Sequence, residues 1–400
     1  MPCRPLRIAV VTETYPPEIN GVAMTLGRMV EGMLARGHSI QLIRPRQRKD
    51  ELPCRRGSLE EVLAPGVPLP RYPNLRLGLP VKHRLLGLWS AHRPQAVLIA
   101  TEGPLGWSAL AAARALGLPV ASEFHTNFHQ YSHHYGFGWF HRAIAAYLRR
   151  FHNRADTTLV PTAALRTRLL AEGYRGVHVV ARGVDIRLFH PCRRSRRLRA
   201  AWGAGDADPV VLYVGRLAPE KNIPLVLRAY DAIAAAQPRA RLVLVGDGPA
   251  RAALEAGGSR AVFAGVRTGE DLARHYASAD VFLFPSETET YGNVTAEALA
   301  SGLAVAAYDY AAAAELVRDG ENGALAPLGH ADAFVAAACR LAQDAEGRMA
   351  RAARARASVE HLDWEQVVAE LLRVMGDIVA DRAKPCGSEH AIVHAPDQCP

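Results

Sequence analysis

PVVLYVG, at residues 209–215, opens the stretch that decides the fold, because its run of apolar residues is continuous and has no polar alternation. Similar runs follow it: RLVLVG at 241–246, AVFAG at 261–265, DVFLFP at 280–285 and LAVAAYD at 303–309. Longer alanine-rich segments with helical spacing separate these runs. Continuous apolar strands that alternate with helices are typical of a parallel sheet covered on both faces. We therefore predict a doubly wound α/β domain over residues 204–363.

The first half of the chain repeats this pattern. Its apolar runs are RIAVV at 7–11, SIQLI at 39–43, AVLIA at 96–100 and TTLVP at 157–161. A chain of 400 residues also exceeds what one hydrophobic core usually organises, about 250 to 300 residues. We predict two Rossmann-like domains that face a central cleft, the first covering residues 1–190.

Three further segments complete the predicted organisation. HPCRRSRRLRAAWG at 190–203 is basic and contains no strand-like run, so we expect an irregular connector at 191–203. Helical periodicity predicts a C-terminal helix at 364–382, expected to pack back on the first domain. The last residues, 383–400, are polar and unpatterned, and we expect them to be disordered.

Composition limits the class of protein. The chain is 49% hydrophobic and 22% charged, values that are ordinary for a globular protein. No uncharged apolar run reaches the roughly 18 residues of a membrane-spanning helix, and we expect a cytoplasmic protein. Six scattered cysteines indicate neither a zinc site nor a disulfide framework. The net charge of +9 favours anionic partners, but charge alone does not choose among nucleotides, acidic lipids and nucleic acid.

A carboxylate pair follows one strand of the second domain. After DVFLFP, the loop SETET contains Glu289. Gly292 and Asn293 are turn residues, and the helix expected from Val294 onward contains Glu297. Ligands of such sheets bind beyond the carboxyl ends of the strands, and a helix N-terminus favours phosphate. Carboxylates accept hydrogen bonds from vicinal hydroxyls, so the loop suits a nucleotide-sugar. The alternative is that Glu297 only complements the helix dipole while Glu289 is solvated.

Two cations follow another strand of the same domain. RLAPEKN leaves the strand at 209–215 and contains Arg216 and Lys221. A guanidinium grips two oxygens while an ammonium acts as a point charge, a combination that suits a diphosphate. The alternative is a surface patch that contributes little energy.

Other enzyme classes fit the sequence less well. The first strand is followed by TETYPPEINGV, which lacks the G-x-G-x-x-G turn of dinucleotide-binding enzymes. A glycosidase would use two carboxylates beside the scissile bond, but it has no diphosphate for the neighbouring cations to hold. There is no D-x-D sequence at a strand end, so we expect no metal.

Several motifs together resemble a known family. YVGRLAPEKN, VGDGP at 245–249 and ETETYGNVTAEALASGLAV are similar to the second domain of family 4 glycosyltransferases, retaining enzymes of the two-domain GT-B fold. The first domain also resembles the mannosyl- and sulfoquinovosyl-transferases of bacteria that glycosylate lipids. The resemblance of the whole chain to the family covers roughly residues 7 to 380. The motifs that carry this likeness are TETYPPEINGVAMTL at 12–26, LPRYPNLRLGLP at 69–80, TEGPLGWSAL at 101–110, EFHTNFHQYSHHYG at 123–136 and GVDIRLFHP at 183–191.

The resemblance implies roles for individual residues. Arg216 and Lys221 would hold the donor diphosphate, Glu289 would bind the transferred sugar, and Glu297 would bind the ribose. Gly21 would let backbone amides approach the phosphates, and His125 would line the sugar side of the cleft. The implied catalytic residues are His125, Glu289, Arg216 and Lys221, and the implied donor-binding residues are Gly21, Arg216, Lys221, Glu289, Gly292, Asn293, Val294 and Glu297.

The implied reaction is transfer of a hexosyl group, with mannose from GDP-mannose favoured, to a hydroxyl of a membrane lipid or glycolipid. Retention without a protein nucleophile implies front-face transfer, with no metal and no cofactor beyond the nucleotide-sugar co-substrate. One alternative is a UDP-sugar-dependent transferase that moves glucosyl or sulfoquinovosyl to diacylglycerol, and another is transfer to a soluble sugar. A GT-B epimerase and a non-catalytic binder of nucleotides or nucleic acid are minor alternatives.

The acceptor side is less defined by sequence. Residues 139–154 predict a basic amphipathic helix, with Phe140, Ile144, Leu148 and Phe151 along one face. Such a face either lies on an anionic membrane or packs on the sheet of its own domain. The basic excess favours a peripheral enzyme on the inner face of the cytoplasmic membrane, with no nucleic-acid partner.

Overall fold

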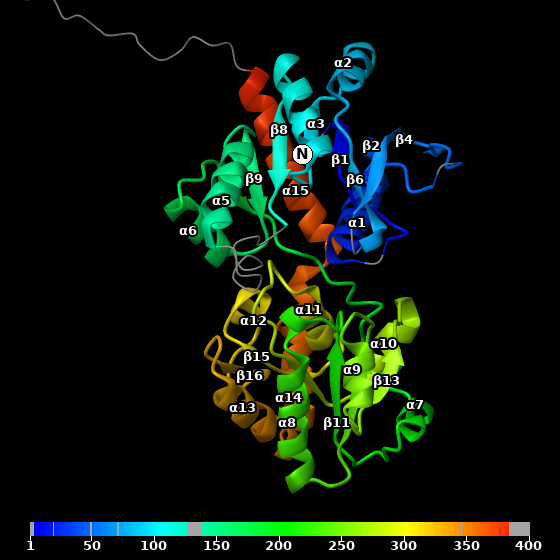
Figure 1. Cartoon of the computed structure of the whole chain (residues 1–400), viewed down its shortest axis with the longest axis vertical. Coiled ribbons are helices and arrows are strands. Elements are labelled where there is room, and N and C mark those ends of the chain that lie inside the picture. Colours follow the sequence, from blue (N-terminus) through cyan, green and yellow to red (C-terminus); the bar gives the residue numbers. More distant parts are fainter. Residues whose placement is uncertain are drawn as a thin grey trace, which may run out of the picture.

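Two α/β domains lie one above the other along the long axis of the molecule (Figure 1). The computed structural model describes residues 4–18, 20–48, 50–69, 72–125, 138–344 and 346–383. Each domain is built on a sheet of parallel strands with helices packed against it, which confirms the predicted fold class.

The N-terminal sheet has eight strands in the order β10-β9-β8-β7-β1-β2-β4-β3. Neighbouring strands are parallel except β3, which runs antiparallel to β4. At the centre, Val10 is in register with Leu42 on one side and Leu98 on the other. The strands are β1 (Arg7–Val11), β2 (Ser39–Pro45), β3 (Arg55–Arg56), β4 (Leu59–Ala64), β7 (Ala96–Ile99), β8 (Val120–Glu123), β9 (Thr157–Val160) and β10 (Val177–Val179), and a separate hairpin comprises β5 (Gly66–Leu69) and β6 (Tyr72–Gly78).

The C-terminal sheet has six parallel strands in the order β13-β12-β11-β14-β15-β16. The five predicted apolar runs form five of them, and almost all of their side chains are buried in β11, β12, β14 and β15. The strands are β11 (Val210–Val214), β12 (Arg241–Val245), β13 (Val262–Gly265), β14 (Val281–Phe284), β15 (Ala304–Tyr308) and β16 (Gly323–Ala326).

Helices connect the strands of both sheets. In the N-terminal domain they are α1 (Gly21–Ala35), α2 (Lys82–Ala91), α3 (Pro104–Ala115), α5 (Gly138–His152) and α6 (Ala163–Ala171). Those that follow along the chain are α7 (Arg196–Ala201), α8 (Ile223–Ala236), α9 (Arg251–Ala256), α10 (Gly269–Ser278), α11 (Asn293–Ala300), α12 (Ala311–Leu316), α13 (Ala331–Gln343), α14 (Arg348–Ala357) and α15 (Trp364–Ala383), with 3₁₀ turns at Pro191–Arg193, Pro219–Lys221 and Glu360–Leu362. Among the described residues, no helix combines the length and apolarity needed to cross a bilayer.

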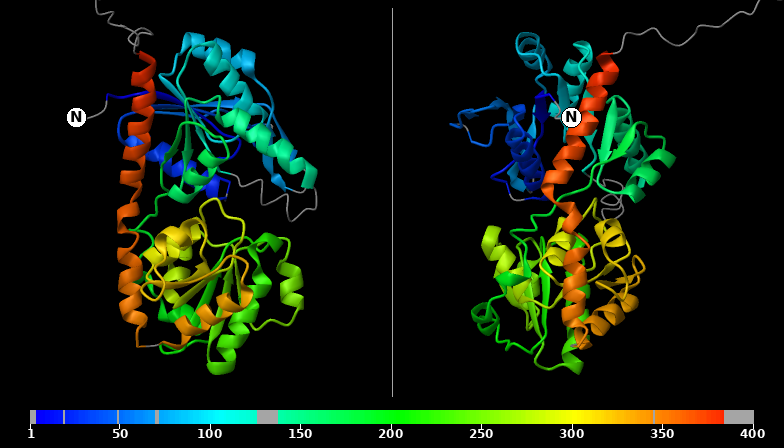
Figure 2. Two further views of the ribbon diagram at one scale, coloured as in Figure 1. Left: turned by 90° about the vertical axis from the view of Figure 1, so that its left-hand side faces the viewer. Right: turned by 180° about the vertical axis from the view of Figure 1, so that it is seen from behind.

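The last helix, α15, returns to the N-terminal domain. Figure 2 shows it running along the side of that domain, and its residues Leu371 and Met375 are fully buried there in a core that includes β1 and α1. Gly32 of α1 permits this close approach, since a Cβ at Gly32 would lie 2.6 Å from Cγ2 of Val368. The expected tail lies outside the described residues from 384 onward.

The stretch expected to be an irregular connector is instead largely ordered secondary structure. Residues 191–203 contain a 3₁₀ turn and helix α7, and α7 contacts α10 of the C-terminal domain. Arg199 is 1% exposed, and its guanidinium donates to Asp280 Oδ2 at 3.1 Å and to the Ser278 carbonyl at 2.7 Å. A basic sequence can form domain core when its charge and donors are satisfied in this way.

The basic amphipathic helix α5 places much of its apolar face inside the protein. Leu148 and Phe151 are almost fully buried, and Ile144 packs against the same core cluster as Leu148. The side chains of residues 138–141, which include Phe140, lie outside the described side chains. The described part of this face therefore packs within the N-terminal domain, which agrees with the second of the two predicted alternatives.

Candidate functional site

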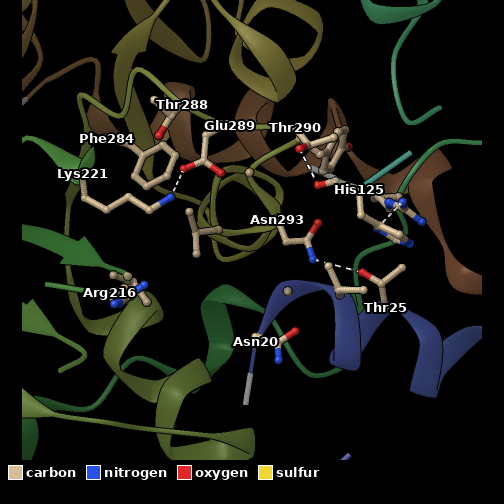
Figure 3. A pocket seen from close by; sticks show the side chains of 18 of the residues that line it. Asn20, Thr25, His125, Arg216, Lys221, Phe284, Thr288, Glu289, Thr290 and Asn293 are labelled. Atoms are coloured by element: carbon tan, nitrogen blue, oxygen red, sulfur yellow. Dashed lines mark hydrogen bonds and ion pairs between the residues drawn. The ribbon is translucent and has the colours of Figure 1, made fainter. Parts of the chain in front are cut away.

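A pocket of about 490 Å³ lies between the two domains and receives residues from both. Helix α1, the ends of β8 and β10, and the loops after β11 and β14 supply its walls (Figure 3). The lining residues are Asn20, Gly21, Val22, Thr25, His125, Arg182, Val214, Gly215, Arg216, Glu220, Lys221, Phe284, Thr288, Glu289, Thr290, Tyr291, Gly292, Asn293 and Val294. All but one of the residues implied for the donor site are in this set; the exception is Glu297.

An ion pair between Lys221 and Glu289 forms the centre of the C-terminal wall. The Lys221 ammonium contacts Oε1 of Glu289, and Ser286 Oγ donates to the same oxygen at 2.7 Å. Lys221 Nζ also lies 5.8 Å from the centre of the Phe284 ring. The two charged side chains are only 17% and 15% exposed. The pair is thus partly desolvated, which strengthens its electrostatic interactions with anything bound beside it.

Arg216 lies nearer the mouth of the pocket. It follows β11, its side chain is 42% exposed, and Nη1 lies 3.8 Å from Oε1 of Glu220. The Tyr213 hydroxyl donates to the Arg216 carbonyl at 3.0 Å, which fixes the turn that presents the guanidinium. Arg216 and Lys221 therefore reach the same pocket from one loop, at different depths.

Two helix N-termini, one from each domain, line the pocket. Gly292 caps α11 in the left-handed region, with φ of 94°, and Asn293 and Val294 begin the helix. Asn20 caps α1 by accepting from the Ala23 amide at 2.9 Å, and Gly21 and Val22 follow it. The first amides of a helix lack intrahelical partners and present positive partial charge. Both helices therefore favour an anion in this pocket.

The N-terminal wall contains charges that are paired with one another. Glu123, 1% exposed at the end of β8, contacts Nε2 of His125 and lies 3.5 Å from Nη1 of Arg182. Burial is the largest single effect on the pKa of Glu123 and acts to raise it, but the interactions with His125 and Arg182 together outweigh burial and lower the pKa to about 2. Arg182 Nη2 lies 3.0 Å from Nδ1 of His125. Both ring nitrogens of His125 therefore face charged side chains of the same wall.

Glu297 does not line the pocket. Its side chain lies beneath α11, where the Tyr276 hydroxyl of α10 donates to Oε2 at 2.8 Å. Desolvation by burial raises the pKa of Glu297 to about 7, although the hydrogen bond from Tyr276 opposes the shift. The two glutamates that sequence placed together thus occupy different environments.

The domains touch each other at the site. Thr290 Oγ1 donates to the His125 carbonyl at 2.6 Å, and Asn293 Nδ2 donates to Thr25 Oγ1 at 3.3 Å. A Cβ built on Gly21 would meet only Asn293 Nδ2 within 4 Å, at 3.9 Å. The protein itself therefore leaves room for a side chain at Gly21, and any restriction there must come from a ligand.

Sequence reasoning missed several residues of the pocket. Arg182 escaped because its strand, β10, is only three residues long and was not predicted, and the role of Glu123 depends on its pairing with Arg182. Asn20 was detectable, since an asparagine before a helical segment is a common N-cap. Thr290 gave no signal of its own, because its interdomain contact depends on the arrangement of the two domains.

No cysteine is among the described residues that line the pocket. Within the described ranges, no group of three or more His, Cys, Asp and Glu side chains is placed to hold a metal ion. The cysteines described by the structure, Cys54, Cys192 and Cys339, are free thiols.

Comparison with known proteins identifies the family. Residues 19–188 match the family described as Glycosyltransferase Family 4, and residues 208–344 match Glycosyl transferases group 1. A GDP-mannose-dependent alpha-mannosyltransferase of Mycobacterium tuberculosis is 36% identical over 369 residues, covering 92% of this chain and 95% of the relative. The chain belongs to glycosyltransferase family 4. The predicted enzyme class, a hexosyltransferase, is confirmed with it.

Other relatives of this glycosyltransferase are more distant. A protein of the same name from Corynebacterium glutamicum is 31% identical, over 94% of this chain and 90% of the relative. The sulfoquinovosyl transferase SQD2 of Arabidopsis thaliana is 32% identical, over 76% of this chain and 61% of the relative.

Solved structures share the fold. The sucrose-phosphate synthase of Thermosynechococcus elongatus superposes with a TM-score of 0.76 at 18% identity, covering 94% of this chain and all of that one. The Anabaena protein HepE, in complex with UDP and glucose, gives a TM-score of 0.72 at 19% identity over 93% of this chain and all of HepE. At these identities the likeness establishes the GT-B fold of the glycosyltransferase.

Proposed function

We propose that this glycosyltransferase moves a mannosyl group from GDP-mannose to a hydroxyl of a membrane lipid or glycolipid, with retention and without a metal. Three relatives that are 31–36% identical are named GDP-mannose-dependent alpha-mannosyltransferases. The single observation that carries the donor site is the interdomain pocket in which Lys221, Arg216 and two helix N-termini converge beside Glu289.

The donor diphosphate is assigned to the C-terminal wall. Lys221, Arg216 and the first amides of α11 all offer positive charge there. Negative charge grows on the leaving diphosphate as the glycosidic bond breaks, and fixed positive groups stabilise the transition state more than the ground state. Cations and amides of the chain itself supply this stabilisation, which supports a mechanism that needs no metal.

Glu289 is assigned to the transferred sugar. Its carboxylate lines the pocket next to Lys221, so a sugar attached to a diphosphate held by Lys221 comes within its reach. Carboxylates accept hydrogen bonds from sugar hydroxyls, and this contact fixes the sugar ring for attack. The role of Glu289 is therefore orientation of the sugar, while the charge of Lys221 acts on the leaving group.

His125 is assigned a positioning role. Both of its ring nitrogens face other side chains, Nε2 toward Glu123 and Nδ1 toward Arg182. A histidine held in this way presents a fixed ring to the pocket rather than a base for the acceptor hydroxyl. In front-face transfer, an oxygen of the departing phosphate takes that proton, so the reaction requires no base from the N-terminal wall.

A UDP-sugar is the second candidate donor. Relatives with 27–32% identity are named alpha-monoglucosyldiacylglycerol synthase and sulfoquinovosyl transferase. These names also support a lipid acceptor and a peripheral position on the inner face of the cytoplasmic membrane.

The donor assignment is tested by thermal unfolding with GDP-mannose, UDP-glucose, UDP-galactose and UDP-sulfoquinovose. A ligand that binds only the folded state raises its stability, by about 2.7 kcal/mol at a hundredfold excess over Kd. We expect GDP-mannose to raise the melting temperature most. A well-folded chain that responds to none of the four contradicts the proposed donor site, and a response to a UDP-sugar alone selects the second candidate.

Gly21→Ala sharpens this test, with Gly87→Ala as its control. The added methyl group meets no protein atom closer than 3.9 Å at Gly21 and none within 4 Å at Gly87, so both variants should fold. Of the two positions, only Gly21 lines the donor pocket. We expect Gly21→Ala to lose most of the donor-induced shift and Gly87→Ala to keep it. Equal shifts in the two variants would mean that the phosphates do not approach Gly21.

A further inference from the structure

The first turn of α6, in the N-terminal domain, receives a carboxylate from the C-terminal domain. Glu315 of α12 accepts a hydrogen bond from the Ala163 amide at 2.8 Å, and the Ala164 amide also donates to this carboxylate. Figure 1 shows α12 on the side of the C-terminal domain that faces the N-terminal domain. Neither Glu315 nor Ala163 lines the interdomain pocket. The contact therefore joins the two domains at a distance from the candidate donor site.

Glu315 completes the cap of α6. The first amides of a helix have no carbonyl partner within the helix and carry positive partial charge. Thr162, the N-cap residue, accepts from the Leu165 amide at 3.1 Å and so satisfies the third helical residue. Glu315 takes the amides of the first two, Ala163 and Ala164. The N-terminal domain thus presents a partly capped helix, and the missing part of the cap comes from the other domain.

The opposite end of α12 holds the loop that contains Glu289. The Ala312 amide donates to the Tyr291 carbonyl at 2.9 Å, and the Tyr310 hydroxyl donates to the Glu289 carbonyl at 2.7 Å. Because α12 is only six residues long, Glu315 and Ala312 lie about one turn apart. A displacement of Glu315 would therefore reach the backbone of the Glu289 loop.

The chain enters α12 in a strained conformation. Ala311, the first residue of α12, has φ of 53°, in the left-handed region that residues with a Cβ rarely adopt. Such a conformation persists only where the surrounding structure holds it. The hydrogen bonds from Tyr310 and Ala312 lie on either side of Ala311, and both lead to the Glu289 loop. The loop and α12 are therefore held together as one unit.

The same loop also contacts the N-terminal domain directly. Thr290 Oγ1 donates to the His125 carbonyl at 2.6 Å. Thr290 lies between Glu289 and Tyr291, whose carbonyls accept hydrogen bonds from α12 and the residue before it. The loop is thus tied to the N-terminal domain twice, once through Thr290 and once through α12 and Glu315. Both connections act on the residue whose carboxylate lines the pocket, Glu289.

We propose that Glu315 is a positioning residue for the transfer reaction, because its contact with α6 fixes the Glu289 loop relative to the N-terminal domain. This inference rests on the proposed function and adds a residue that lies outside the pocket. Without the contact, Lys221 and Arg216 still bind the diphosphate, but the sugar-binding carboxylate is less well placed. A misplacement of about 1 Å can cost about 100-fold in rate, so transfer is sensitive to such a change.

The rate of GDP release from GDP-mannose tests the proposal, with diacylglycerol in detergent micelles as the acceptor. GDP binding is measured separately by calorimetric titration. The first variant is Glu315→Gln, which keeps the size of the side chain and removes its charge. The second is Ala163→Pro, which removes the amide donor from the other domain. Proline is tolerated at the first residue of a helix, and the extended backbone of Thr162 suits a residue before proline, so this variant should fold.

Glu321→Gln is the matched control, because it removes the same charge just after α12. Glu321 is 58% exposed, and its contact with Arg318 spans 3.8 Å. We expect kcat to fall about three- to tenfold in Glu315→Gln and in Ala163→Pro, the fold-change of one capping contact. GDP affinity should be unchanged in both, and the control should match the unaltered chain. The double variant should lose no more than the larger single loss, because both changes break one contact.

Three kinetic results would overturn the proposal. The first is an unchanged kcat in Glu315→Gln, and the second is an equal loss in Glu321→Gln. The third is a pair of losses that add in the double variant, since independent sites add. A parallel loss of GDP affinity and kcat would place the effect on the diphosphate site rather than on Glu289, and would overturn the proposal as well.

Hydrogen exchange of the same proteins reads the domain contact without any transfer. The amides of Ala163 and Ala164 should exchange at least about threefold faster in Glu315→Gln than in the unaltered chain. Equal exchange in the two proteins would overturn the contact, whatever the value of kcat. Faster exchange in the variant, together with no GDP release by the unaltered chain, would contradict the proposed function but leave the contact standing.

Discussion

The two walls of the interdomain pocket both contain paired charges, but they bury those charges to different degrees. On the C-terminal wall, Lys221, Glu289 and Arg216 line the pocket and remain 15–42% exposed. On the N-terminal wall, His125 and Arg182 line the pocket and pair with Glu123, which is 1% exposed and lies behind them. The more accessible C-terminal wall suits a charged ligand, while the buried pairs of the N-terminal wall provide a fixed shape. This difference supports the proposal that the donor binds the C-terminal domain and that the N-terminal wall positions it.

The largest expected effect comes from breaking the internal pairing of the N-terminal wall. Glu123→Gln leaves Arg182 buried without its counter-charge, and removing one partner of a buried ion pair typically costs about 3–5 kcal/mol. We expect a loss of this size in the free energy of unfolding, measured with urea. Glu31→Gln is the control, because its contact with Arg28 is largely exposed and should contribute less than about 1 kcal/mol.

The pH dependence of Glu123 follows from its lowered pKa. A carboxyl whose pKa falls from 4.5 to about 2 on folding stabilises the protein above pH 4.5. That contribution is lost as the pH falls from 4.5 toward 2. The unaltered chain should therefore lose stability over this window more steeply than Glu123→Gln does. Identical urea midpoints for the two proteins at neutral pH would show that the wall is not held by this charge.

A smaller effect is expected behind the C-terminal wall, at the buried Glu297, which does not line the pocket. Its pKa rises from 4.5 to about 7 on folding, so ionisation above pH 7 destabilises the folded state, and this penalty disappears as the pH falls below 7 toward 4.5. Glu297→Gln keeps an acceptor for Tyr276 but cannot ionise. We expect its melting temperature to exceed that of the unaltered chain by a few degrees near pH 8, and to match it near pH 5. The same difference at both pH values would contradict the raised pKa.

The sequence predicted the fold well where apolar runs were continuous. The runs at 7–11 and 209–215 became the central strands β1 and β11, because strands buried on both faces need no polar residues. Strands β10 and β16 were missed. They are only three or four residues long, and β16 consists mostly of glycine and alanine. The prediction of an irregular connector at 191–203 was wrong because Ser278 and Asp280, which accept hydrogen bonds from Arg199, are about 80 residues away in sequence.

The site was predicted in part for a similar reason. Arg216, Lys221 and Glu289 follow strand ends, and parallel topology brings strand ends together. Glu297 was grouped with Glu289 because the two are close in sequence, but the direction of its side chain depends on Tyr276 from another helix. The pairing of Glu123 with Arg182 depends on β10, a strand of three residues that the sequence did not reveal.

The division of labour between Lys221 and Glu289 is the central claim, and calorimetric titration with GDP tests it most directly. The variants are Lys221→Met and Glu289→Gln, which each remove one charge of the ion pair while keeping the size of the side chain. We predict that Lys221→Met weakens GDP binding roughly ten- to a hundredfold, the value of one or two charge-assisted hydrogen bonds. Glu289→Gln should bind GDP as the unaltered chain does but fail to transfer the sugar. Equal losses of GDP affinity in the two variants would contradict the account.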